Sequence, residues 1–434
     1  MEDHTRDKRR QVELESPAEN RVPIQVRTPH LRNIEDRGWA MYFHGRRAIL
    51  DEVADIRAKA MRNGDGTIFL IQGAPGAGKT ALLYQCMAEA KDRGWEVGRI
   101  KSDALYSPAA MAEALGRKYM TRREVGTGVD LKVAAASKTQ EYTGTTSVHA
   151  LLSKEAPVEG LLLVLDEAQH LAKFTGDPNE RVAGDTLQAI HNGELKRPVI
   201  LLAGGLSTSG AAFEQLGVSR FRGGCVVNLG RLSAKNGRAV IRDWLVLEGG
   251  AKGDVTPWVD VIAAETYGWP QHIVAYTEPA AAVIRESGGQ LAPAALQVVV
   301  EAGRRQRRDY YLNRVSHLVK KERDALGTLL RSRGPEATFE KDEIQTAVWL
   351  GAVDAEQCFN QLLHKGVFTM THNGTYYVPI PSMRDWLVRE YERGLEDGKQ
   401  PLAATPPHNT TGDPASQHGL RISYDIPANR RTYG

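Results

Sequence analysis

Short runs rich in apolar residues alternate along the chain with longer segments in which apolar residues recur every three or four positions. The recurrence at Ile49, Leu50, Val53 and Ile56 predicts a helix. The apolar runs predict buried strands, at 67–72, 97–101, 161–165, 199–203 and 226–229. Strands separated by helices indicate a parallel sheet covered on both faces, so the expected fold class is α/β.

The same pattern divides the chain into segments. Residues 1–30 are polar and charged without periodicity, and residues 393–434 are rich in Pro, Gly, Thr, Asn and His, so both are expected to be disordered. The α/β core is expected at 31–232, with an insertion rich in small residues at 121–150. Amphipathic spacing predicts helices through 233–314 and a further compact unit at 315–392.

The unit at 315–392 carries three helical patterns, followed by two β-rich runs. Asn373-Gly374, a dipeptide typical of hairpin turns, separates these runs. This order predicts a winged helix, with its recognition helix at 354–364 and its hairpin at 367–378. The recognition helix carries Asp354 and Glu356, and Lys365 is the basic residue near its end. A DNA-binding role and a protein-docking role both stay open for this unit.

Composition indicates a compartment more than a function. A chain of 434 residues that is 41% hydrophobic and 25% charged is ordinary for a globular protein of two or three domains. A net charge of +3 argues neither for nor against nucleic acid. Cys86, Cys225 and Cys358 are too scattered for a disulfide framework or a metal site. The charged N-terminus and the lack of long apolar runs predict a cytoplasmic protein without a signal peptide or membrane span.

The most specific motif is a glycine-rich loop of the form G-x-x-x-x-G-K-[ST] between a predicted strand and a predicted helix. It comprises Gly73, Ala74, Pro75, Gly76, Ala77, Gly78, Lys79 and Thr80, and it leads into Ala81. Its glycines let successive backbone N–H groups point at phosphates, and the helix N-terminus favours anions. Lys79 can reach the β- and γ-phosphates, and the Thr80 hydroxyl can ligate Mg²⁺. The loop therefore predicts ATP and Mg²⁺ as ligands.

A second acidic motif completes this prediction. The apolar run at 161–165 ends in Asp166-Glu167, the form of a Walker B strand. Asp166 can hold Mg²⁺, and Glu167 can polarise an attacking water, so the chain is expected to be an ATPase. The continuation Ala168-Gln169-His170 resembles the DEAD and DEAH boxes of helicases, but the other helicase motifs are not found downstream.

In their order, these features resemble the AAA+ ATPases, above all the origin-recognition and Cdc-type initiators and the bacterial transposition regulators. The resemblance spans about residues 40–390. It implies a five-stranded sheet of order 5-1-4-3-2, a helical lid and a C-terminal winged helix. Gly45 and Arg46 belong to a Phe-x-Gly-Arg box that touches the adenine side in such proteins, although a plain helix start explains them equally well.

The resemblance also implies roles for three later positions. Ser207 follows the strand at 199–203, at the place of the sensor 1 residue that contacts the γ-phosphate or the water. Arg220, with Arg222 as the alternate, would be an arginine finger acting on a neighbouring subunit. Pro270 lies at the sensor 2 position, where the next residue is Gln271 instead of arginine. The Gly-x-Pro form resembles the STAND signalling ATPases, in which that proline packs on adenine.

The expected function is an ATP-driven switch that forms a homo-oligomer and acts on double-stranded DNA or on a DNA-bound partner. A basic run around Arg305 and Arg308, with Tyr310 and Tyr311 beside it, suits backbone contact and base stacking. A solvated linker helix with inward tyrosines explains the run equally well. The alternative function is a STAND-like signalling or defence ATPase that recruits protein partners without binding nucleic acid. The winged helix would then be structural, although a protein partner that docks on it also stays open.

Overall fold

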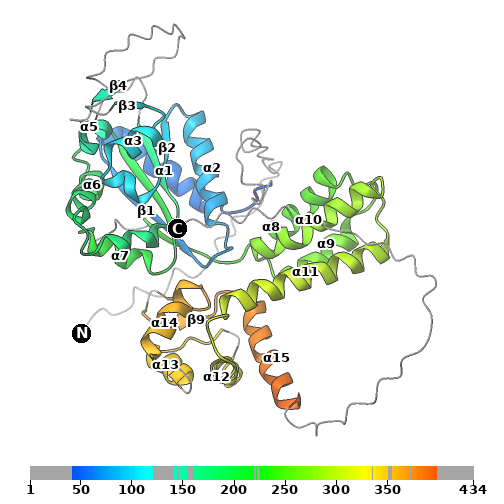
Figure 1. Ribbon diagram of the computed structural model, residues 1–434. Coiled ribbons are helices and arrows are strands. Elements are labelled where there is room, and N and C mark those ends of the chain that lie inside the picture. The colour runs from blue at the N-terminus through cyan, green and yellow to red at the C-terminus, as the bar shows by residue number, and fades with distance from the viewer. Residues whose placement is uncertain are drawn as a thin grey trace, which may run out of the picture. The chain divides into compact units, whose positions relative to one another are not determined.

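The computed structural model describes residues 42–120, 141–143, 146–153, 160–218, 221, 225–334, 336–349, 354–371 and 373–397 (Figure 1). The predicted arm at 1–30, most of the insertion at 121–150, and all of the predicted tail beyond residue 397 lie outside these ranges. Arg220 and Arg222 also lie outside them.

A five-stranded parallel sheet forms the N-terminal part of the chain. Its strands are β1 (Thr67–Gly73), β2 (Glu96–Ile100), β5 (Leu161–Leu165), β6 (Val199–Gly205) and β7 (Val226–Leu229), and they lie in the order β2-β5-β6-β1-β7. When only these strands are numbered along the chain, the order from β7 reads 5-1-4-3-2. The predicted strands and parallel sheet are therefore confirmed.

Two further strands, β3 (Lys118–Met120) and β4 (Glu141–Thr143), were not predicted, and they shift the numbering of the later strands. They form a separate parallel pair. Together with helix α5 (Val148–Ser153), they show that the segment predicted as an irregular insertion contains regular structure near its ends. Short strands of three residues carry too little periodicity for a sequence pattern to show them.

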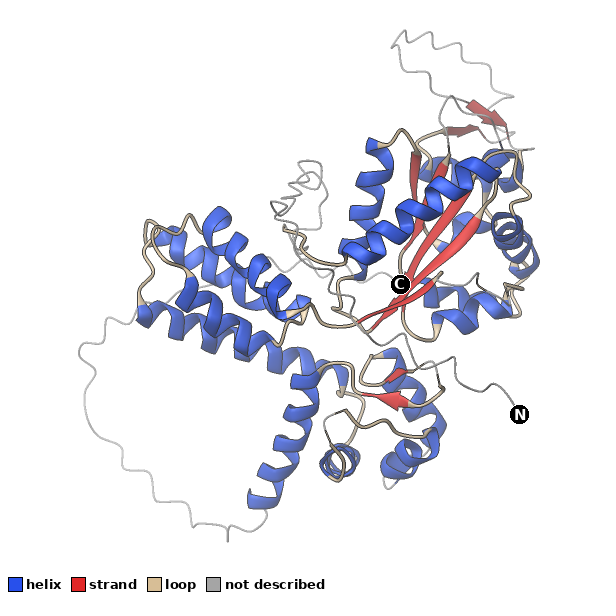
Figure 2. Cartoon of the chain, turned by 180° about the vertical axis from the view of Figure 1, so that it is seen from behind, coloured by secondary structure: helices blue, strands red, loops and turns tan. Residues whose placement is uncertain are grey.

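Helices cover both faces of the sheet, as Figure 2 shows. One face carries α1 (Arg47–Asn63) and α2 (Lys79–Asp92), and the other carries α3 (Pro108–Ala114), α5, α6 (Glu180–Asn192) and α7 (Ser209–Gln215). Short 3₁₀ turns lie at η2 (Ser102–Leu105) and η3 (Ala168–Phe174). Within β1, Phe69 and Ile71 pack toward α1 and α2, whereas Ile68 and Leu70 pack on the opposite face. Burial on both faces explains why the central strands β1, β5 and β6 are rich in apolar residues, whereas the edge strands β2 and β7 are partly exposed.

A helical module follows the sheet. It consists of α8 (Ala234–Asp243), a π-helical turn η4 (Trp244–Glu248), α9 (Thr256–Thr266), α10 (Pro270–Glu286) and α11 (Pro293–Arg314). Its core contains Trp244, Trp258 and Tyr276. Gly303 lets α11 approach α10 closely, because a Cβ at this position would lie 2.6 Å from the buried Tyr276 ring.

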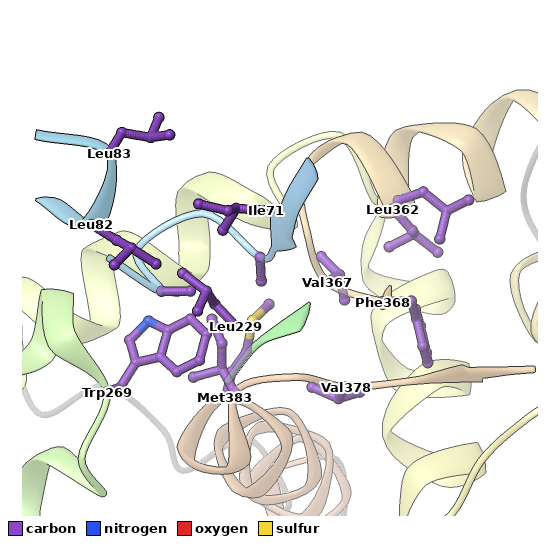
Figure 3. Packing of buried hydrophobic residues seen from close by; sticks show 14 of the residues in the cluster. Ile71, Leu82, Leu83, Leu229, Trp269, Leu362, Val367, Phe368, Val378 and Met383 are labelled. Atoms are coloured by element: carbon purple, nitrogen blue, oxygen red, sulfur yellow. The ribbon is translucent and has the colours of Figure 1, made fainter. Parts of the chain in front are cut away.

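The C-terminal module contains α12 (Lys320–Arg331), α13 (Lys341–Trp349), α14 (Ala355–His364), the strands β8 (Thr369–Met370) and β9 (Tyr376–Tyr377), and α15 (Pro381–Asp397). The strands pair antiparallel around Gly374, whose φ of 83° suits the turn, so the predicted hairpin is confirmed. Its apolar residues join the cluster formed by α1, α2 and one sheet face. Figure 3 shows Ile71 and Leu229 in this cluster with Trp269, Val367 and Met383.

No helix within the described ranges combines the length and the apolar character that a membrane crossing requires.

The fit between β1 and its neighbours gives a stability prediction. A Cβ at Gly66, just before β1, would lie 2.2 Å from the Ile190 carbonyl oxygen and 2.9 Å from that of Val199. Because these are backbone atoms, we expect Gly66→Ala to destabilise the fold by about 1–3 kcal/mol, as overpacking does. Gly334→Ala, where the added Cβ meets nothing within 4 Å, should change stability by less than about 0.5 kcal/mol. Thermal unfolding of both variants checks this, and equal midpoints would contradict it.

Candidate active site

The predicted phosphate-binding loop joins the end of β1 to the start of α2. Gly76 and Gly78 have φ angles of 83° and 90°, which residues other than glycine rarely adopt. Lys79 is buried, and its Nζ donates to the carbonyl oxygens of Gly73 at 2.9 Å and Ala74 at 3.2 Å. The loop thus curls around the ammonium group at the N-terminus of α2, an arrangement that favours an anion.

Burial is the main influence on the charge of this lysine. It lowers the pKa of Lys79, while the nearby carboxylates of Glu167 and Asp166 act in the opposite direction. A bound phosphate would add negative charge at the same place, and it would favour the protonated amine further.

Thr80 and Asp166 meet beside the loop, although they belong to α2 and to the residue after β5. The Thr80 hydroxyl donates to Asp166 Oδ2 at 2.5 Å. Burial raises the pKa of Asp166, and the hydrogen bond from Thr80 works against that rise. A hydroxyl and a carboxylate oxygen at one point are hard ligands of the kind that Mg²⁺ prefers, so these residues fit the predicted metal.

Glu167 has an unusual backbone. Its φ of 55° and ψ of 44° are left-handed, and its N–H donates to Asp166 Oδ1 at 3.0 Å. The exposed Glu167 carboxylate accepts a hydrogen bond from Gln169 Nε2. A non-glycine residue in this conformation costs about 1–3 kcal/mol, and such strain clusters at functional sites.

The Phe-x-Gly-Arg box lies between the loop and the helical module. Arg46 donates to the Gly230 carbonyl oxygen and approaches that of Ala77 at 3.5 Å. Burial lowers the pKa of Arg46 to about 10. A Cβ at Gly45, which has a φ of 82°, would lie 2.6 Å from the Asn236 amide of α8, so a larger residue would be excluded. These contacts go beyond those of a plain helix start.

The start of α10 lies against the glycine-rich loop. The Gln271 N–H donates to the Gly76 carbonyl oxygen at 3.2 Å. Trp269 is fully buried, and a Cβ at Gly76 would lie 3.0 Å from its indole nitrogen. Pro270 is the nearest group to Gly78, at 3.6 Å from the position of an added Cβ. The structure therefore brings the Gly-x-Pro motif to the phosphate-binding loop.

Ser207 lies two residues after β6, the strand that pairs with β1. Gln72 Nε2 donates to its carbonyl oxygen at 3.0 Å, and the Met370 N–H of the C-terminal hairpin approaches its hydroxyl at 3.4 Å. The side chain is buried. Because the hydroxyl only accepts in this bond, its own O–H stays available to donate to a γ-phosphate.

Sequence reasoning missed two contacts from the end of α11. Tyr310 Oη donates to the Pro75 carbonyl oxygen at 2.8 Å, and Arg314 Nη2 lies 3.3 Å from the same oxygen. Arg314 also donates to the Lys365 carbonyl oxygen. The tyrosines pack inward, with Tyr311 only 1% exposed, so of the two interpretations of this run the structure favours the one with inward tyrosines. The sequence pattern of a basic run is the same whether its tyrosines face the core or the solvent.

The structure brings the P-loop and the acidic strand end together at one edge of a parallel five-stranded sheet. Residues 42–190 match the family model described as an AAA ATPase domain. The chain therefore contains an AAA ATPase domain, and its reaction is the hydrolysis of ATP.

Similar solved structures have low sequence identity. The Aeropyrum pernix ORC2 protein, in ADPNP and ADP complexes, is 14% identical with a TM-score of 0.46, covering 88% of this chain and 97% of that one. A Walker-type ATPase of Pyrococcus abyssi is also 14% identical with a TM-score of 0.46, and the covered shares are 78% and 95%. Drosophila ORC bound to DNA is 12% identical with a TM-score of 0.40, with 80% and 87% covered. A search of curated proteins finds no match.

A buried histidine behind Gln271 gives a pH prediction. Burial, and then the charges of Arg307 and Arg314, lower the pKa of His272 to about 3, against about 6.5 in an unfolded chain. The unfolded state therefore binds a proton that the folded state rejects. His272 therefore costs no stability above pH 6.5. Below that pH, its effect should lower the free energy of unfolding by about 1.4 kcal/mol for each pH unit.

His272→Gln should reduce this loss on acidification, and His364→Gln at the exposed end of α14 should leave it unchanged. Chemical unfolding between pH 7.5 and 5 measures both. An unaltered pH slope in His272→Gln would show that His272 is not held neutral.

Proposed function

We propose that this protein is an ATP-driven switch that assembles on ATP binding and acts on double-stranded DNA or a DNA-bound partner. The loop amides and Lys79 hold the phosphates, and Thr80 with Asp166 holds Mg²⁺. When bound, Mg²⁺ supplies positive charge against the phosphate oxygens. The proposal draws its support from the convergence of these groups at one edge of the sheet.

Glu167 is the proposed water-activating group. Its carboxylate orients a water and accepts a proton from it as the water oxygen bonds to the γ-phosphorus. The bond between the γ-phosphorus and its bridging oxygen breaks, which releases ADP. Lys79 faces the negative charge that this oxygen gains.

The lack of an arginine at the sensor 2 position supports assembly. At the sensor 2 position the helical module presents Gln271, which cannot neutralise the charge of the transferring phosphoryl group. Arg314 lies near the loop, but it is engaged by the carbonyl oxygens of Pro75 and Lys365. We therefore infer that Arg220, or Arg222 beside it, completes the site of a second copy of this chain.

This inference predicts complementation between inactive variants. Lys79→Ala and Arg220→Ala should each lower the turnover rate by about 10³-fold or more. A 1:1 mixture should recover up to about a quarter of the wild-type rate, because random mixing pairs an intact loop with an intact finger at that share of interfaces.

Arg62→Ala, on the exposed face of α1, is the charge-matched control and should keep full activity. Arg222→Ala separates the two finger candidates. If Arg220→Ala and Arg222→Ala both hydrolyse ATP at the wild-type rate, and the rate per subunit is independent of concentration, the site is self-contained and the assembly proposal fails.

The end of α11 supplies the proposed DNA contact. Arg305 and Arg308 are exposed, and so are Lys320 and Lys321 at the start of α12. Arg304 is less suitable because Glu265 pairs with it. The C-terminal module is proposed to be a winged helix, but Glu356 on α14 binds Lys341 and makes that helix a poor phosphate contact.

Salt dependence tests this surface. If Arg305 and Arg308 each contact a phosphate, Arg305→Ala/Arg308→Ala should weaken binding to duplexes of any sequence. The slope of log affinity against log salt should fall by about 2. Lys59→Ala/Arg62→Ala on α1 removes the same charge from another exposed surface and should leave the slope unchanged. Equal slopes for both double variants would remove α11 from the interface.

The STAND-like alternative has its own supporting observation. Pro270 lies at Gly78, and the C-terminal module reaches the site through Met370 and Lys365. In that case the module recruits a protein partner when ATP binds, and ATP hydrolysis is indifferent to DNA. Turnover that is unchanged by duplex DNA at low salt would favour this alternative.

A further inference from the structure

Gln169 connects the proposed water-activating carboxylate to the turn after β6. Its Nε2 donates to Glu167 Oε2, and its Oε1 accepts from the Leu206 N–H at 3.2 Å. Both polar atoms of the Gln169 amide are thus hydrogen-bonded, although Leu206 lies far from Gln169 along the chain. Gly205 permits this approach, since a Cβ there would lie 3.0 Å from Gln169 Oε1.

Glu167 depends on such a partner for its position. Its side chain is exposed, and its left-handed backbone is rarely favoured in a non-glycine residue. Asp166, in contrast, is held by Thr80 and by the Glu167 N–H. An exposed glutamate loses considerable rotamer freedom when it is fixed, so a directed amide donor has a clear effect on its orientation.

The other end of the Gln169 amide reaches the residue before Ser207. Ser207 is the proposed γ-phosphate sensor, and its own carbonyl oxygen is held by Gln72 at the end of β1. A movement of this turn on ATP binding would therefore move Gln169 and, through it, the Glu167 carboxylate.

We propose that Gln169 is a positioning residue that orients Glu167 toward the water and ties that orientation to the turn at Leu206 and Ser207. This inference rests on the proposed role of Glu167.

The test compares Gln169→Ala and Gln169→Glu with the wild type in the full chain. We expect Gln169→Ala to lower kcat on the order of 10- to 100-fold, with KM for ATP and the Kd for ADP changed less than about 2-fold, because the phosphate-binding loop is untouched. Gln297→Ala, at an exposed position on α11, is the matched control and should behave as wild type.

A near-isosteric variant distinguishes positioning from general damage to the fold. Gln169→Glu keeps nearly the shape of glutamine but lacks the amide donor, so it should lower kcat at least as much as Gln169→Ala while the Kd for ADP changes less than about 2-fold. A wild-type kcat in Gln169→Ala or in Gln169→Glu would overturn the inference.

Glu167→Gln, measured in parallel, separates the two proposals. If Glu167→Gln is inactive while Gln169→Ala is fully active, Glu167 keeps its role and the role of Gln169 falls. If Glu167→Gln retains wild-type turnover, the proposed role of Glu167 fails, and the inference about Gln169 fails with it. Nucleotide binding by each variant, measured with ADP, confirms that the site is folded.

Discussion

The structure depends on how the glycine-rich loop satisfies its own carbonyl groups. A loop that aims its N–H groups at phosphates must turn carbonyl oxygens elsewhere, and buried carbonyls require donors. These donors come from elements that are far apart in the sequence: Lys79 for Gly73 and Ala74, Tyr310 and Arg314 for Pro75, Gln271 for Gly76, and Arg46 for Ala77. The loop is therefore the point at which the sheet and the helical modules meet.

Under the proposed role of Lys79, this arrangement would connect nucleotide binding to the rest of the molecule. If bound phosphates drew Lys79 away from the carbonyl oxygens of Gly73 and Ala74, the hydrogen bonding of the loop would change. Such a change would reach Pro75, against which Gly366 of the C-terminal module packs so closely that a Cβ at position 366 would lie 2.4 Å from the proline ring. Packed interfaces of this kind respond by switching between arrangements rather than by deforming smoothly.

The two acidic residues after β5 illustrate how adjacent groups acquire different properties. Asp166 is buried and directly bonded to Thr80, so its position follows from the backbone of α2. Glu167 is exposed, and its carboxylate is hydrogen-bonded to Gln169, which also bonds the turn after β6. Under the proposed roles, a fixed metal-binding carboxylate beside an adjustable catalytic one would suit a site that must hold ATP before it hydrolyses it.

The sequence by itself determined the features that rest on local pattern. The central strands were predictable because burial on both faces makes them rich in apolar residues. The loop was predictable because its glycines adopt local backbone angles that other residues rarely adopt. The contacts of Gln169 with Leu206 and of Tyr310 with Pro75 were decided only in the tertiary structure, because they join residues 37 and 235 positions apart. Neither residue carries a periodic signal, since a polar side chain takes its partner from whichever element packing places beside it.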